Sequence, residues 1–174
     1  MLLADFNKTI DIWIEELAYY DIESLRMKPD RTGWSMGQLY MHILHETTWY
    51  FEQIGLCFSH PEHADEEMLE SAKTMFHNNS FPDEIIKGDP LLSENVKQPE
   101  DIQSLLYAFQ QLKAHATDIW AKIKTSEIYG KSRHPGFQFL DPGEWFQFAE
   151  MHMRHHLKQK SRIDAFLGSQ PSPY

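Results

Sequence analysis

His152 and His156 lie one helical turn apart, within the segment Glu150-Met-His-Met-Arg-His-His-Leu-Lys-Gln159. A helix over residues 142 to 167 would place both imidazoles on its apolar, core-facing stripe. Steps of three and four residues define that stripe, which consists of Trp145, Ala149, His152, His156, Gln159, Ile163 and Phe166. Because an imidazole buried without a partner is costly, two of them on this stripe require a partner. A metal ion meets that requirement.

His42 is the candidate for a third ligand from a facing helix. Imidazoles at positions i and i+4 project the same way and can hold one first-row metal ion with such a ligand. Three neutral nitrogen donors leave coordination positions open for water or substrate, as in catalytic sites, where the ion activates water or binds a thiolate or carbonyl. Glu46 and Gln159, each one turn beyond a histidine, are the candidate catalytic residues. Both would orient ligands, and Glu46 would also transfer a proton.

The periodicity alone supports metal binding and a pair of hydrogen-bonded core histidines equally. His155 diverges by ~100° from its neighbour His156 on a helix, so we expect it to flank the site or to be exposed. We also expect surface roles for the histidines at 60, 63, 77 and 115, and core packing for the tryptophans at 34, 49 and 145.

The composition of the chain excludes several classes of protein. The 174 residues are 41% hydrophobic and 13% aromatic, which indicates a folded domain. The formal net charge of -10 argues against nucleic acid as a partner. Cys57 is the only cysteine, which excludes an internal disulfide and a thiolate metal cage. Since neither a signal peptide nor an apolar run of membrane-spanning length is present, we expect a cytoplasmic protein that does not interact with membranes.

Hydrophobic periodicity and capping residues predict four long helices. The first covers residues 3 to 25, and the second runs from Met36 to Phe58 behind a capping box of Ser35 and Gln38. The third opens at Pro99-Glu-Asp and ends near Ser126. The fourth follows the capping sequence Asp141-Pro142-Gly-Glu144 and stops at Gly168, a predicted C-cap.

Residues 59 to 98 form a connection too long for a tight turn, with a short helix predicted from Asp65 to Met75. Such a connection allows helices two and three to run parallel. We therefore predict an all-α, four-helix bundle with one long crossover between helices 2 and 3. Residues 1 to 168 would form a single domain, with an aromatic loop over 127 to 140 and a frayed tail over 169 to 174.

Three segments carry a resemblance to a known family. Trp34-Ser-Met-Gly-Gln-Leu-Tyr-Met-His42 resembles the Trp-Ser/Thr-x-x-Gln segment that ends in the first metal-binding histidine of the DinB/YfiT-like superfamily. His134-Pro-Gly-Phe-Gln-Phe-Leu140, Glu144-Trp145 and His152-x-x-x-His156-x-x-Gln159 resemble the motifs of one uncharacterised branch. Gln138 stands where that branch tends to have glycine, so we expect a different loop shape there. Residues 60 to 130 contain nothing diagnostic.

The resemblance implies a bundle, often a homodimer, that binds one divalent metal ion through His42, His152 and His156. We expect zinc or nickel, although three imidazoles also suit copper and iron. The superfamily includes hydrolases and thiol-dependent transferases that act on low-molecular-weight thiol conjugates. The first hypothesis is therefore a metal-dependent hydrolase or thiol S-transferase with a small-molecule substrate such as a thiol conjugate. The alternative is a non-catalytic metal-binding or stress-response bundle that acts through a partner.

Overall fold

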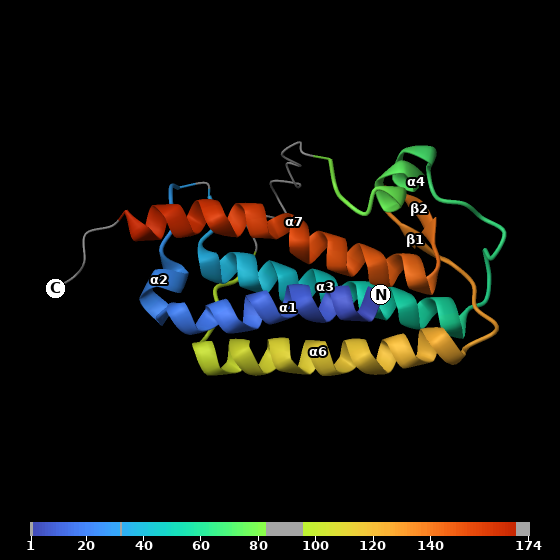
Figure 1. The fold of residues 1–174 in the computed structure, drawn as a ribbon, viewed down its shortest axis with the longest axis horizontal. Coiled ribbons are helices and arrows are strands. Elements are labelled where there is room, and N and C mark those ends of the chain that lie inside the picture. The colour runs from blue at the N-terminus through green and yellow to red at the C-terminus, as the bar shows by residue number, and fades with distance from the viewer. Residues whose placement is uncertain (1, 32, 83–95, 170–174) are drawn as a thin grey trace.

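The computed structural model describes residues 2–31, 33–82 and 96–169. Within these ranges the four longest helices lie lengthwise beside one another (Figure 1): α1 (Leu2–Glu16), α3 (Met36–Ser59), α6 (Ile102–Thr125) and α7 (Pro142–Gly168). Both α6 and α7 pack against α1 and α3. The predicted all-α, four-helix bundle is confirmed.

The connection between α3 and α6 is a crossover. In Figure 1 the colour advances in the same direction along α3 and α6, so these two helices are parallel. The chain must return along the bundle between them, and on the way it forms the helix α4 (Glu70–His77). This helix lies later than the predicted one because a turn, in which the Glu66 N–H donates to the His63 carbonyl, occupies the expected start. Residues 83–95 of the predicted crossover lie outside the described residues.

Side-chain caps fix where the two histidine-bearing helices begin. Ser35 Oγ accepts the N–H of Gln38, and the Gln38 side chain accepts the N–H of Ser35, which is the predicted capping box. Asp141 and Glu144 form the same reciprocal pair at the start of α7. These capping boxes therefore fix the residues at which α3 and α7 begin.

The end of α7 differs from the prediction. Gly168 is the last helical residue rather than the C-cap, and Ser169 caps the helix in the right-handed conformation with its N–H on the Phe166 carbonyl. Gly168 does not have a positive φ, so the expected role of glycine does not arise at this position. Of the predicted tail, residues 170–174 lie outside the described residues.

The predicted first helix is wrong as one continuous element. After α1 the chain forms a 3-10 turn, η1 (Leu17–Tyr19), and then a separate helix, α2 (Ile22–Arg26). Asp21 caps α2 through a capping box with Ser24, and this local competitor breaks the helix. Leu17 and Leu25 are both buried, so the apolar periodicity persists across the break. The periodicity therefore predicted correctly which residues are buried, but it did not predict that the helix is interrupted.

The predicted loop over 127 to 140 contains an unpredicted hairpin of β1 (Ser132–His134) and β2 (Gln138–Leu140), paired with His134 opposite Gln138. The crossover joins this hairpin, because Met68 forms a bridge with Gln138 and the Leu69 N–H donates to the Phe137 carbonyl. Strands this short carry almost no periodicity, and their pairing depends on contacts distant in the sequence.

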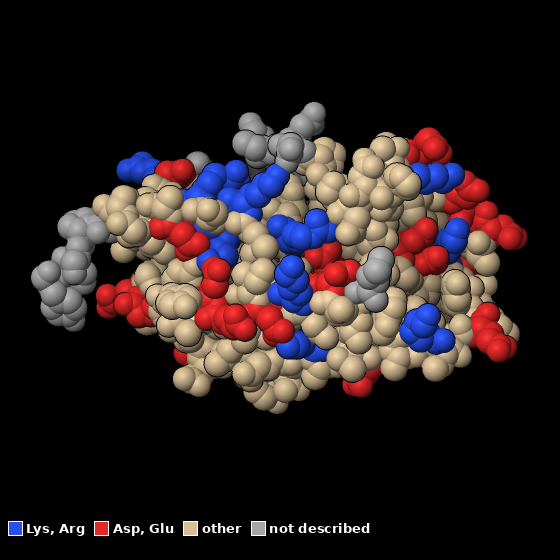
Figure 2. Space-filling view, viewed as in Figure 1, with Lys and Arg blue, Asp and Glu red and all other residues tan. Residues whose placement is uncertain are grey.

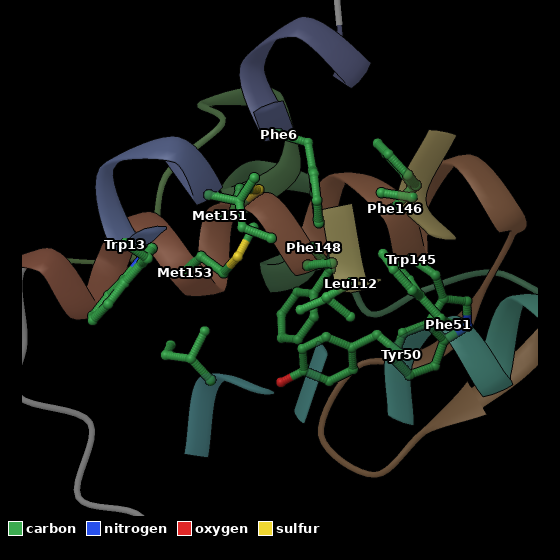
Figure 3. Packing of buried hydrophobic residues seen from close by; sticks show 14 of the residues in the cluster. Phe6, Trp13, Tyr50, Phe51, Leu112, Trp145, Phe146, Phe148, Met151 and Met153 are labelled. Atoms are coloured by element: carbon green, nitrogen blue, oxygen red, sulfur yellow. The ribbon is translucent and has the colours of Figure 1, made fainter. Parts of the chain in front are cut away.

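The core between the helices is rich in aromatic rings. Figure 3 shows part of it, with Phe6, Trp145 and Phe146 among the fully buried members. Trp145 is therefore a core residue as predicted, while Trp34 and Trp49 are partly buried and pack against the core. Burial of each large ring stabilises the fold by about 1.5–3 kcal/mol, so this core holds α3 and α7 rigidly together.

The surface is acidic around the crossover. The exposed acidic residues there are Glu62, Asp65, Glu66, Glu67 and Glu70, and Figure 2 shows red atoms gathered at the α4 end of the molecule. Lys73 offsets part of this charge by pairing with Glu67 and Glu70. Within the described ranges, no helix has the length and apolarity of a membrane span.

Candidate metal centre

Three imidazoles from two helices converge between α3 and α7. The Nε2 atom of His156 lies 3.2 Å from Nε2 of His42 and 3.1 Å from Nε2 of His152. One ligand atom from each of the three residues lies within 4.8 Å of the others. The helical spacing aims His152 and His156 in one direction, and packing of α3 on α7 brings His42 opposite them.

The environment keeps these imidazoles neutral. Burial lowers the pKa of His42 to about 3, with a further contribution from His156. Burial also lowers the pKa of His156 to about 4, against the opposing effect of its hydrogen bond to Gln159. His152 is more deeply buried, and its pKa falls well below the usual value of 6.5. Each ring therefore retains one nitrogen lone pair at neutral pH.

Gln159 selects the tautomer of His156. Its Oε1 lies 2.9 Å from Nδ1 of His156, and because a carbonyl oxygen only accepts, Nδ1 carries the proton. The lone pair of His156 is then on Nε2, which faces the other two rings. A ligand that gives its second N–H to a fixed acceptor is the usual arrangement around a bound metal.

The donor set fits a divalent metal ion. A single lone pair on Nε2 of His156 cannot serve both neighbouring Nε2 atoms well, whereas a cation at their centre would attract all three. Imidazole nitrogens about 2.0–2.1 Å from a tetrahedral ion lie about 3.3 Å apart. Two of the three separations, 3.1 and 3.2 Å, are close to that spacing, and all three lie within 4.8 Å.

Glu46 lies one helical turn after His42 on α3, and its carboxylate is close to Tyr50 and His45. Its Oε2 accepts the hydroxyl proton of Tyr50 at 3.3 Å, and its Oε1 lies 3.7 Å from Nδ1 of the exposed His45. The Glu46 side chain is 32% exposed, so it reaches solvent. Of the two predicted catalytic residues, the structure brings Gln159 into contact with a histidine of the cluster and leaves Glu46 adjacent to it.

Sequence and structure comparisons identify the family. The sequence profile of the DinB superfamily matches residues 5–159, a range that includes His42, His152, His156 and Gln159. The chain belongs to the DinB superfamily. Among solved structures, YfiT from Bacillus subtilis is 12% identical with a TM-score of 0.68, over 97% of this chain and 87% of that chain. YfiT is described as a probable metal-dependent hydrolase with an unusual four-helix bundle topology. No curated protein sequence matches significantly.

The His-Pro-Gly-Phe loop of this DinB protein packs behind the cluster. Nδ1 of His134 accepts the N–H of Gly136 at 3.0 Å, and the ring stacks on Phe137 at 4.5 Å. Burial lowers the pKa of His134 to about 4. The ring approaches the three-histidine cluster through Phe148, which lies 5.0 Å from His134 and 6.3 Å from His152. The motif was visible in the sequence, but its contact with Phe148 was not.

The other histidines have roles outside the cluster. His155 flanks it, with its ring 5.5 Å from His156 and 5.0 Å from Phe81. His115 is exposed and lies 5.4 Å from Phe51, on a different face of α3. The crossover histidines at 60, 63 and 77 are exposed, as expected.

Replacing Gln138 with glycine is expected to stabilise this DinB protein by about 0.5–1 kcal/mol. Gln138 has a φ of 67°, in the left-handed region where a Cβ is unfavourable, so its backbone keeps a conformation that suits glycine. Urea unfolding would measure the change. Gln138→Ala removes the exposed side chain but keeps the Cβ, and it should gain nothing. Equal stabilisation by alanine and glycine would contradict the backbone explanation.

Proposed function

We propose that this DinB protein is a divalent-metal-dependent enzyme, either a hydrolase or a low-molecular-weight thiol S-transferase. The metal would be held by Nε2 of His42, His152 and His156, with zinc or nickel as the ion. The convergence of three neutral imidazoles supports this proposal, because one lone pair cannot satisfy both neighbouring Nε2 atoms. When bound, the ion supplies Lewis acidity that activates water or a thiol.

Residues of the chain itself would orient a metal ligand and transfer a proton. Gln159 holds the ring of His156 by accepting its Nδ1 proton, which fixes the direction of the Nε2 lone pair. Glu46 would accept the proton of the attacking water or thiol, since it lies one turn from His42 and is partly open to solvent. Tyr50 restrains that carboxylate through its hydroxyl.

The substrate we propose is a small molecule such as a thiol conjugate. The net charge of -10 and the acidic crossover oppose polyanionic partners such as nucleic acid. The description of YfiT as a probable metal-dependent hydrolase supports the choice of hydrolysis. We further propose that the protein acts in the cytoplasm as a homodimer, which light scattering of the purified protein would test.

An activity screen tests the function. Metal-free protein, reconstituted with zinc or nickel, would be assayed on thiol conjugates and on small amides and esters. We expect turnover only with metal, loss of turnover in His156→Ala, and a decrease of about 100-fold in Glu46→Gln. His115→Ala, on another face of the bundle, should retain full activity. Turnover that survives metal removal would contradict the proposal.

The same screen distinguishes the proposed enzyme from the alternative, a non-catalytic protein. If the metal raises the melting temperature but no substrate turns over, the protein is a non-catalytic metal-binding bundle that acts through a partner. Chelation would then lower stability without an enzymatic consequence.

A further inference from the structure

His152 and His156 are held in different ways. Nδ1 of His156 has Gln159 as its partner, whereas Nδ1 of His152 is buried and has no hydrogen-bond partner among the residues that the structure describes. His152 is 9% exposed, so its ring is enclosed by protein. Histidine ligands of metal ions normally donate this second N–H to a fixed acceptor, which orients the ring. Something else must orient His152.

Two aromatic side chains enclose the ring of His152. The ring of Phe148, one turn earlier on α7, is nearly parallel to it, with an interplanar angle of 19° and a centroid separation of 6.3 Å. The ring of Tyr50 on α3 meets it edge to face at 90° and 5.5 Å. These geometries are the preferred ones for aromatic pairs. Tyr50 and Phe148 also contact each other at 5.0 Å, and Figure 3 shows them together.

We propose that Phe148 and Tyr50 are positioning residues for the metal, which hold the ring of His152 so that its Nε2 points at the site. This inference rests on the proposed metal site. A stacked ring on one side and a perpendicular ring on another limit rotation of the imidazole about its side-chain bonds. Packing therefore replaces the missing hydrogen bond as the restraint on this ligand.

Phe148 is itself restrained by both segments outside the bundle. Phe81 of the crossover lies 5.4 Å from it, and Phe137 of the hairpin loop lies 5.6 Å from it. Gln147 binds the crossover next to the contact between Phe81 and Phe148, because its Nε2 donates to the Phe76 carbonyl at 3.0 Å. The His-Pro-Gly-Phe loop thus acts on His152 through Phe148, whereas the crossover acts both through Phe148 and directly, since Phe81 also lies 6.5 Å from His152.

Replacing Phe148 with leucine tests the proposal. We expect the zinc dissociation constant, measured by competition with a chromogenic chelator, to rise about tenfold or more, as for other residues that orient metal ligands. The matched control is Phe146→Leu, because Phe146 is a buried ring on the same helix that packs on Phe6, Phe51 and Trp120 instead. Phe146→Leu should lose comparable stability and keep its zinc affinity. Equal zinc affinities for Phe148→Leu and the unsubstituted protein would overturn the proposal, and so would an equal loss in both variants.

Tyr50 provides a second test that does not depend on the folding of Phe148→Leu. Tyr50→Phe keeps the ring and removes the hydroxyl, so it should retain zinc affinity, whereas Tyr50→Leu should lose it. The visible spectrum of the cobalt-substituted protein should change in Tyr50→Leu but not in Tyr50→Phe. If both variants bind zinc normally, the positioning role is wrong.

These measurements separate this inference from the proposed function. Stoichiometric zinc with unchanged affinity in all the variants would overturn the positioning role alone. Stoichiometric zinc with the predicted losses, but no turnover on any substrate, would overturn the enzyme and keep the positioning role. If neither zinc nor nickel binds to the unsubstituted protein, both are overturned.

Discussion

Replacing His152 with alanine is expected to reduce the bound metal from about one equivalent per chain to almost none. His152 supplies one of three Nε2 atoms that converge between α3 and α7, and its loss leaves two ligands on opposite helices. Structural zinc sites bind with about 10–16 kcal/mol over four ligands, so one ligand is worth on the order of 100-fold or more in affinity. Metal analysis of protein purified without a nickel resin would measure this.

His155→Ala is the matched control for this substitution. His155 lies on the same helix and flanks the cluster, yet it is not one of the three converging residues. We expect it to retain about one equivalent of metal. A low metal content in the unsubstituted protein, unchanged by His152→Ala and by added zinc or nickel, would show that the three rings form a hydrogen-bonded histidine network instead.

Acid is expected to destabilise the metal-free protein strongly. Burial lowers the pKa of His42 to about 3, and those of His134 and His156 to about 4, while the pKa of His152 is well below 6.5. Unfolded histidine titrates near 6.5, so below that pH the unfolded chain binds more protons than the folded chain. The stabilisation that these neutral rings contribute to the folded state is present above pH 6.5, and it is lost as the pH falls towards 4.

The expected loss between pH 7.5 and pH 5 is on the order of 5 kcal/mol. Each ring contributes at most about 2 kcal/mol over this range, and the partly exposed His42, His134 and His156 contribute less than this because solvent screens them. Such a loss is comparable with the whole stability of many domains. Urea unfolding at a series of pH values, after chelation, would measure the slope.

His134→Asn should reduce the dependence of the unfolding free energy on pH. The asparagine oxygen can accept the Gly136 N–H in place of Nδ1, and the side chain does not titrate. A stability that stays constant or increases as the pH falls from 7.5 to 5 would show that the histidines are not buried in their neutral form.

Local sequence signals predicted the histidine-bearing helices well. Capping pairs such as Ser35 with Gln38 act over three residues, so their hydrogen bonds follow directly from the sequence. The i and i+4 spacing placed His152 and His156 on one face for the same reason. His42 as the third member was also predicted, and the structure brings it within 3.2 Å of His156.

The contacts of the two predicted catalytic residues were not encoded by helical periodicity. Glu46 and Gln159 look equivalent in the sequence, since each lies one turn beyond a histidine. The structure shows that Gln159 contacts His156 while Glu46 contacts Tyr50 and His45. All of these contacts lie within one helix, so side-chain rotamers decide between them, and helical periodicity does not encode the rotamers.

The sequence by itself therefore determined the helices, their buried faces and the direction of two imidazoles, because these follow from hydrogen bonds and spacing within one helix. Only the tertiary structure decided the joining of the hairpin to the crossover and the enclosure of His152 by Phe148 and Tyr50. These features depend on contacts between segments that are distant in the sequence. That outcome is fixed by packing of the whole bundle rather than by any local pattern.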